Sequence, residues 1–350
     1  MSESVSRRTL LGAGAAALAP QGTRAAAGGK VKFGLDLFSV RSQGWTPMQH
    51  LDFAAKWGVE VVHFSEVRFL GGLEEDNLRK VRARAGELGI EVEIGMLSIC
   101  PTSKMFNKSQ GTAEEQLTRM IDAAKTVGSR IVRCVLGSSA DRTGEIPLEA
   151  HIENTAKVLR NVRSRVVDAG LKVAIENHAG DMQAREVKTL IEAAGRDFVG
   201  SCLDSGNPLW TIEDPHLTLE TLAPYVLTSH VRDTAVWNTP QGAAVAWTRM
   251  GEGNIGMEDY IREYAAKCTG KPLSLEVIVT GPRNFNYRDP KFWDAYRATP
   301  AWEFVRFQAL AEKGTPRAAP PQVSREAGMA REVEDVEASI RWTKAFLEKV

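Results

Sequence analysis

Residues 171–178 read Leu-Lys-Val-Ala-Ile-Glu-Asn-His, a short apolar run that ends at an acidic residue, Glu176. The same pattern recurs downstream, where apolar runs end at Asp204, His230 and Glu276. Short apolar runs that alternate with helical stretches are typical of parallel strands in an α/β fold. We therefore expect each of these polar residues at the C-terminal end of a strand.

The alternation of strands and helices extends in both directions from residues 171–178. It gives eight predicted strands at intervals of about 30 residues. They cover residues 31–37, 59–64, 90–97, 130–136, 171–176, 198–204, 225–230 and 272–276. Repeated units of this kind close into a barrel whose C-terminal strand ends face one mouth. The predicted fold class is α/β, a (β/α)8 TIM barrel with a C-terminal helical extension.

Residues 1–27 have the layout of an export signal. The pair Arg7 and Arg8 precedes a mildly apolar stretch, and the small residues 25–27 resemble a cleavage site. Consecutive arginines before a weakly hydrophobic core are typical of twin-arginine signals, and the stretch is too short to span a bilayer. We expect a periplasmic or secreted protein without a membrane anchor. The alternative is a disordered leader on a cytoplasmic protein.

The rest of the chain divides into a barrel, residues 28–313, and a tail, residues 314–350. The tail opens with a Pro/Ala-rich linker and ends in a predicted helix, residues 325–350, with one apolar face. Such a helix either caps its own barrel or packs on a neighbouring subunit. The sequence is therefore compatible with a homo-oligomer as well as with a monomer.

Charge and cysteine content exclude several classes of protein. The chain has 44 basic and 44 acidic residues, and this balance argues against a nucleic-acid partner. Four cysteines are scattered without a C-x-x-C pair, so we expect buried free thiols and neither disulfides nor zinc ligands.

Convergence of the four strand-end residues would create an oxygen-rich site for one divalent cation. Each carboxylate taken alone has a structural alternative, which is an ion pair with a Lys or Arg at the barrel mouth. Four such groups together favour a cation, because burying that much carboxylate without positive charge is costly.

Five motifs in chain order strengthen this interpretation. They are Ile-Glu-Asn-His at 175–178, Asp-Ser-Gly-Asn at 204–207, His-Val-Arg-Asp at 230–233, Gly-Glu-Gly-Asn-Ile-Gly at 251–256 and Leu-Glu-Val at 275–277. In this order they resemble the xylose-isomerase-like superfamily of sugar isomerases and epimerases, over most of residues 31–282. The resemblance implies that Glu176, Asp204, His230 and Glu276 bind one divalent ion (Mn²⁺, Mg²⁺, Co²⁺ or Zn²⁺). It also implies that Glu176 and Glu276 are the acid/base pair.

The expected function is isomerisation or epimerisation of a sugar, keto-sugar or sugar acid. A divalent ion that chelates a carbonyl stabilises the enediolate, and two carboxylates on opposite faces then remove and return a proton. The alternative uses the same metal-bound enolate in a lyase or decarboxylase of an oxo-sugar acid or keto-glycoside. In both cases the expected partner is a small carbohydrate.

Four further residues are candidates for substrate binding, namely Glu66, His178, Arg232 and Arg41. Structural hydrogen bonds or ion pairs are the alternative role for each. Together with Arg68 and Arg249, the two arginines fall on predicted mouth-side loops, where guanidinium groups could hold a carboxylate or phosphate. Because export does not suit a phosphorylated substrate, we expect a sugar acid or an oxidised sugar.

The motifs also depart from one branch of the superfamily. Ketose 3-epimerases commonly carry a His three residues after the aspartate and an Arg six residues after the histidine, whereas Asn207 and Val236 stand here. A free ketose is therefore disfavoured as the substrate. Six histidines and neutral charge disfavour a three-zinc endonuclease. Intact Glu176 and Glu276 argue against a catalytically silent sugar-binding barrel. His63 is expected to be structural.

Overall fold

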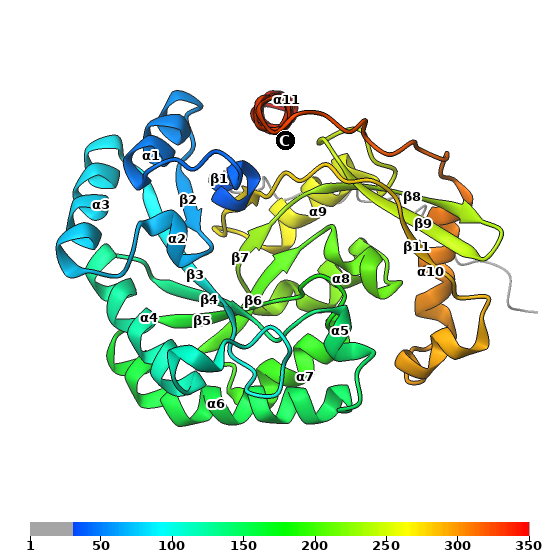
Figure 1. Ribbon diagram of the computed structural model, residues 1–350, viewed down its shortest axis with the longest axis horizontal. Coiled ribbons are helices and arrows are strands. Elements are labelled where there is room, and N and C mark those ends of the chain that lie inside the picture. The colour runs from blue at the N-terminus through cyan, green and yellow to red at the C-terminus, as the bar shows by residue number, and fades with distance from the viewer. Residues whose placement is uncertain (1–30, 350) are drawn as a thin grey trace, which may run out of the picture.

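The structure is a computed structural model that describes residues 31–349. The predicted signal peptide, residues 1–27, lies outside the described residues. Eight parallel strands form one sheet, and a bridge between Val231 and Leu275 connects its last strand to its first. The sheet closes into a barrel with helices around it (Figure 1), so the predicted TIM-barrel fold is confirmed.

The barrel strands occur in sheet order β10-β1-β2-β3-β4-β5-β6-β7. Their bounds are β1 Phe33–Asp36, β2 Val61–Phe64, β3 Glu91–Ser98, β4 Ile131–Val135, β5 Lys172–Glu176, β6 Val199–Asp204, β7 Val226–His230 and β10 Leu273–Leu275. In the register, Glu176 lies beside Cys202 and Asp204 lies beside His230. Asp204 and His230 are therefore level with each other, and Glu176 lies level with a residue two positions before Asp204, so that all three strand ends reach one mouth of the barrel.

The main outer helices are α1 Pro47–Lys56, α3 Glu75–Leu88, α4 Ala113–Val127, α6 Leu148–Asp168, α7 Ala184–Ala194, α8 Pro215–Leu222 and α9 Met257–Lys267. Thr46 and Thr112 form capping boxes that start α1 and α4. Short helices on the connections are α2 Val67–Leu70, α5 Ser139–Arg142, η1 Leu37–Val40, η2 Lys108–Gln110, η3 Asn207–Thr211, η4 Ala223–Tyr225 and η5 Pro290–Ala295.

The predicted C-terminal helix forms α11 Arg325–Leu347 and packs on its own barrel. Val336, Ile340 and Phe346 are buried in the main hydrophobic core. Near its C-terminal end, Lys344 donates a hydrogen bond to the carbonyl of Trp57 at the end of α1. Helix α11 therefore covers the barrel beside β1 (Figure 1). None of the described helices combines the length and apolar character needed to cross a membrane.

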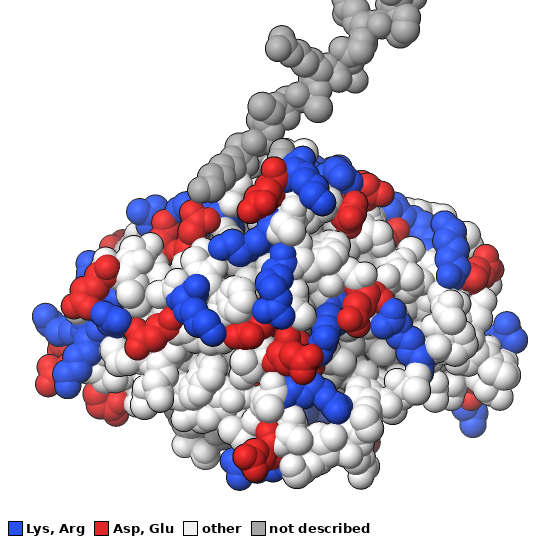
Figure 2. Space-filling view, turned by 90° about the horizontal axis from the view of Figure 1, so that it is seen from above, with Lys and Arg blue, Asp and Glu red and all other residues white. Residues whose placement is uncertain are grey.

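The exposed face over this region carries charges of both signs. Figure 2 shows Lys and Arg side chains interspersed with Asp and Glu side chains, without a continuous area of either sign. This distribution accords with the equal numbers of basic and acidic residues in the sequence. An extended nucleic-acid backbone would find no basic stripe on this face.

The segment after β7 forms a β-hairpin. Strands β8 Asp233–Thr239 and β9 Gly242–Thr248 pair antiparallel, and β11 Arg283–Phe285 adds a third strand. Helix α10 Ala301–Glu312 packs on β8. The sequence gives little indication of these strands, because the hairpin turn lacks an Asn-Gly signal and β11 comes from a distant part of the chain. The hairpin carries Trp247 toward the barrel mouth.

Two glycines provide a matched test of core packing. A Cβ added to Gly200 in β6 would lie 2.5 Å from the carbonyl oxygen of Tyr225, a backbone atom that has little room to move. We expect Gly200→Ala to lower the free energy of unfolding by about 1–3 kcal/mol. Gly86 in α3 is exposed and a Cβ there meets nothing within 4 Å, so Gly86→Ala should raise it by about 0.5–1 kcal/mol. Urea unfolding of both variants checks this, and equal effects would contradict it.

Candidate metal centre

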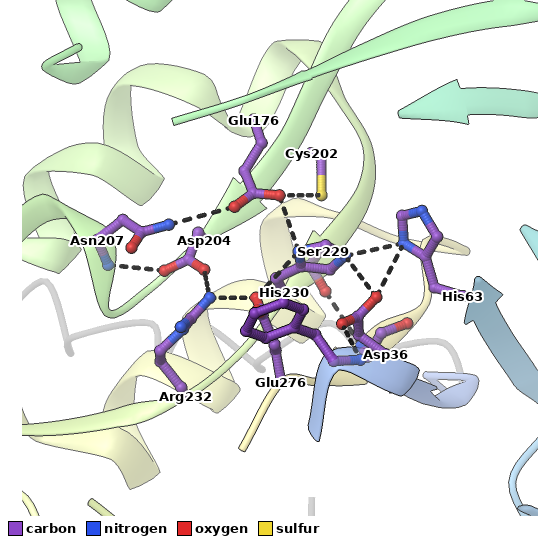
Figure 3. Close-up of polar contacts among 12 residues, drawn as sticks. Asp36, His63, Glu176, Cys202, Asp204, Asn207, Ser229, His230, Arg232 and Glu276 are labelled. Atoms are coloured by element: carbon purple, nitrogen blue, oxygen red, sulfur yellow. Dashed lines mark hydrogen bonds and ion pairs between the residues drawn. The ribbon is translucent and has the colours of Figure 1, made fainter. Parts of the chain in front are cut away.

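Four side chains from four strand ends converge at the barrel mouth (Figure 3). Potential ligand atoms of Glu176, Asp204, His230 and Glu276 all lie within 4.8 Å of one another, and all four residues are buried. Three of these residues end β5, β6 and β7, and Glu276 directly follows β10. The structure thus brings together the four residues that the sequence predicts as metal ligands.

The imidazole of His230 is oriented by its surroundings. Its Nδ1 atom lies 2.9 Å from Glu176 Oε2 and 3.1 Å from Glu276 Oε2. Adjacent ligands of one cation, each about 2.1 Å from it, are about 3 Å apart in octahedral geometry. Nδ1 thus faces two carboxylate oxygens at once. The donor set and this spacing therefore fit one divalent ion.

On its other side, the His230 ring contacts side chains from β1 and β2. Its Nε2 atom lies 2.8 Å from His63 Nδ1 and 3.5 Å from Asp36 Oδ2. Hydrogen bonds of this kind fix the tautomer and ring orientation of a ligating histidine. His63, expected to be structural, thus supports a candidate ligand directly.

Two buried arginines neutralise part of the cluster. Arg133 in β4 donates to Glu176 Oε2 from Nε at 2.6 Å, and its Nη2 lies 2.5 Å from the same oxygen. Arg232 donates to Asp204 Oδ2 at 2.5 Å and also contacts Glu276 Oε2. Arg133 was not predicted as a site residue, although a charged residue inside the apolar run 131–135 is a signal that could have identified it.

The two glutamates are ionised at neutral pH. Burial by itself raises the pKa of Glu176, but Arg133 and His230 lower it more, so that this pKa lies well below its ordinary value. Burial likewise raises the pKa of Glu276, and Arg232 and His230 overcome this effect and bring it to about 2. Both carboxylates can therefore ligate a cation or accept a proton.

The positively charged side chains do not fully neutralise the buried carboxylates of the cluster. Burial raises the pKa of Asp204 to about 7, although Arg232 lowers it in part. Burial also raises the pKa of Asp36 to about 7, against the attraction of His230. The cluster therefore has room for additional positive charge, which a divalent cation would provide.

Two asparagines position the carboxylates. Asn177 exchanges hydrogen bonds with the Asp204 backbone, each 2.9 Å long, and so joins the ends of β5 and β6. Backbone N–H groups of Gly206 and Asn207 both donate to Asp204 Oδ1 at 2.7 Å, which leaves Oδ2 to face the cluster. The Asn207 side chain donates to Glu176 Oε1 at 3.2 Å. Asn207 is thus a positioning residue, whereas the sequence identified it only as a difference from the ketose 3-epimerases.

The predicted substrate-binding residues fall into two groups. His178 and Arg232 lie at the cluster. His178 stands two residues after the end of β5, with its Nδ1 2.7 Å from the carbonyl oxygen of Gly137, and Arg232 binds two candidate ligands. Glu66 and Arg41 lie at the partly exposed rim. Glu66 pairs with Arg68 at 2.5 Å, and Arg41 pairs with Glu332 of α11 at 3.4 Å.

A cavity of about 240 Å³ opens at this rim, between the connections that follow β2 and β3. Its walls include Glu66, Arg68, Ser98, Asn107 and Arg119. The segment at 98–111 contributes Ser98 and Asn107 to this wall. The rim therefore has space and polar groups for part of a small ligand.

A comparison with known protein families identifies the family to which the chain belongs. The family model for the xylose isomerase-like TIM barrel matches residues 51–293, which is more than half of the chain. The chain therefore belongs to this family, and the resemblance seen in the sequence motifs is confirmed. Members of the family include enzymes that modify sugars.

One curated relative shares part of this sequence. The 3-oxo-isoapionate decarboxylase of Pectobacterium atrosepticum is 25% identical over 185 residues, which are 53% of this chain and 60% of the relative. The match thus spans less than two thirds of that protein.

Solved structures show the shared fold. D-psicose 3-epimerase from Clostridium cellulolyticum, solved with D-tagatose, superposes with a TM-score of 0.57 at 14% identity, covering 80% of this chain and 96% of that one. A xylose isomerase-like protein from Mycobacterium smegmatis, solved with magnesium, gives 0.56 at 13% identity, covering 80% and 98%.

Proposed function

We propose that this protein is a divalent-metal-dependent isomerase or epimerase that acts on a sugar, keto-sugar or sugar acid through an enediolate. The observation that carries the proposal is the convergence of four candidate ligands within 4.8 Å, two of them ionised glutamates on one histidine nitrogen. Glu176, Asp204, His230 and Glu276 would hold the ion. When bound, a divalent cation polarises a substrate carbonyl and stabilises negative charge on the adjacent oxygen.

The surroundings of Glu176 and Glu276 differ, and this difference suggests separate roles for them in proton transfer. Both Glu176 oxygens already have partners, because Asn207 donates to Oε1 and Arg133 donates to Oε2. Glu276 uses Oε2 for Arg232 and His230, and its Oε1 has no hydrogen bond within residues 31–349. Glu276 is also the more accessible carboxylate, at 6% exposed against 0% for Glu176. We assign Glu276 as the group that removes the proton and Glu176 as its partner on the opposite face.

A decarboxylase is the second candidate function, and one specific observation favours it. The curated relative quoted above is named for decarboxylation of an oxo-sugar acid, and it matches 53% of this chain. The same cluster would serve, because loss of carbon dioxide also leaves negative charge next to a carbonyl that needs stabilisation. Export by the twin-arginine-like leader remains part of the proposal, with a periplasmic or secreted location.

The test combines two assays on protein loaded with Mn²⁺, Mg²⁺, Co²⁺ or Zn²⁺. Keto-sugars and oxo-sugar acids are incubated in heavy water, and recovered substrate and product are analysed for deuterium by mass spectrometry while released carbon dioxide is measured. Deuterium uptake without carbon dioxide supports the isomerase or epimerase. Stoichiometric carbon dioxide supports the decarboxylase. Absence of exchange, of carbon dioxide and of turnover across the panel would refute both.

A further inference from the structure

The arginines that the sequence offered for an acidic substrate group already have carboxylate partners. Arg41 pairs with Glu332, Arg68 with Glu66, Arg232 with Asp204 and Glu276, and Arg249 with Asp335 and Glu334. A guanidinium that already faces a carboxylate gains less from a second anion. An acidic substrate therefore needs a cation elsewhere at the mouth.

Arg283, the first residue of β11, meets this need. Its guanidinium lies over the ring of Trp210, 4.2 Å from the ring centre, and its Nη2 donates to Ser139 Oγ at 3.0 Å. Phe285 lies on another side, 5.8 Å from the guanidinium carbon. Within residues 31–349 no carboxylate forms an ion pair with Arg283. The group is thus held in place by stacking and one neutral hydrogen bond, with its charge uncompensated.

Arg283 lines a cavity of about 440 Å³ beside α5 and η3, which lie on the connections that follow β4 and β6. The wall also contains Ser139, Arg142, Lys291, Phe292 and Tyr296. Lys291 is exposed and forms no ion pair with a described residue. The other charges of the wall are matched, since Arg142 pairs with Glu186, and Asp294 pairs with Arg297. The cavity therefore presents two uncompensated cations.

A continuous stack connects this cavity to the candidate metal centre. Trp210 stacks on Trp247 with ring centres 4.3 Å apart and planes 5° apart, and the Arg232 guanidinium lies 4.4 Å from the Trp247 ring centre. Arg232 in turn binds the candidate ligands Asp204 and Glu276. The indole rings of Trp210 and Trp247 thus separate Arg283 from the candidate metal centre. A ligand that reaches both places has its anionic group remote from its reacting carbon.

We infer that Arg283, with Lys291 and Ser139, forms an oxyanion subsite that binds a carboxylate at the end of the substrate remote from the reacting carbon. The direction of the substrate rests on the proposed function, whereas binding of the anion does not. A carboxylate held there is not the group lost in a decarboxylation, because it lies beyond two tryptophans from Glu276. The inference thus favours an acidic sugar unit that anchors a substrate and stays intact.

The test uses the purified full-length chain, isothermal titration calorimetry and two probes that differ only in a carboxylate, D-glucuronate and D-glucose. Glucuronate should bind and glucose should not. Arg283→Gln should weaken glucuronate binding about tenfold, as expected for loss of a charge-assisted hydrogen bond. The matched control Arg288→Gln, an exposed arginine that donates to the Pro240 carbonyl outside the cavity wall, should leave it unchanged.

Several results would overturn the inference. They are no glucuronate binding, equal binding of glucose, or no change in Arg283→Gln. Inorganic phosphate is the third probe. If phosphate binds and glucuronate does not, the subsite is specific for a phosphate group and the inferred carboxylate ligand is wrong. Should Arg283→Gln fail to fold, Lys291→Gln, an exposed position, is expected to weaken binding about threefold, and no change there would count against the subsite. Metal content, measured on the same samples, tests the proposed function separately.

Discussion

Glu276→Gln is expected to lower turnover of the metal-loaded enzyme about a thousandfold, because a general base contributes about 10²–10⁴ in rate. Glutamine keeps the shape of the side chain and an oxygen for Arg232, but it cannot accept a proton. Its effect should fall on kcat more than on KM, since the lost interaction belongs to the reaction step. Deuterium exchange from heavy water should fall by the same factor, because Glu276 is the group proposed to carry the exchanging proton.

A matched control comes from another buried carboxylate. Glu213 lies between α7 and α8, accepts hydrogen bonds from Thr218 and the Ala184 backbone, and has its pKa raised to about 7 by burial. Glu213→Gln should retain wild-type turnover. If Glu276→Gln keeps more than about a tenth of the wild-type rate with its metal bound, the assignment of Glu276 as the base is wrong.

Removal of Arg133 should have the largest effect on stability. Arg133 and Glu176 are almost completely buried and paired, so Arg133→Met leaves a buried carboxylate without its main counter-charge. Breaking such a pair costs about 3–5 kcal/mol. We expect a loss of that size in the free energy of unfolding of metal-free protein, measured by urea denaturation at pH 8.

The pH dependence of this loss follows from the direction of the pKa shifts. In the wild type the depressed pKa of Glu176 contributes stability above the pKa of the unfolded chain. We expect that without Arg133 the effect of burial brings the folded pKa of Glu176 above its unfolded value, and in that case stability falls as pH rises through that interval. The loss should therefore be smaller at pH 5 than at pH 8. The double variant Arg133→Met/Glu176→Gln should recover at least half of it, and an additive double variant would contradict the coupling.

The ligand cluster was predictable because each member marks a visible boundary in the sequence. Glu176, Asp204 and His230 each end an apolar run, and the parallel pairing of the strands then brings such ends to one mouth. No distance information was needed, since the barrel topology supplies the convergence.

The residues that sequence reasoning missed depend on direction and distant pairing. Arg133 sits inside a strand, and an apolar run does not tell which face a central residue occupies when both faces are buried. Arg283 reaches the mouth only because β11 pairs with β9, a strand some 40 residues away in the sequence. His63 gains its role from the position of the His230 ring. Side-chain direction and long-range pairing were the missing information.

The most direct measurement is titration of chelator-treated protein with Mn²⁺ by calorimetry, in the wild type and in His230→Gln. One ion per chain is expected to bind the wild type, and binding should weaken at least about tenfold in the variant, which lacks the nitrogen facing both glutamates. An absence of binding, or equal binding in both proteins, would show that these strand ends do not form a metal centre.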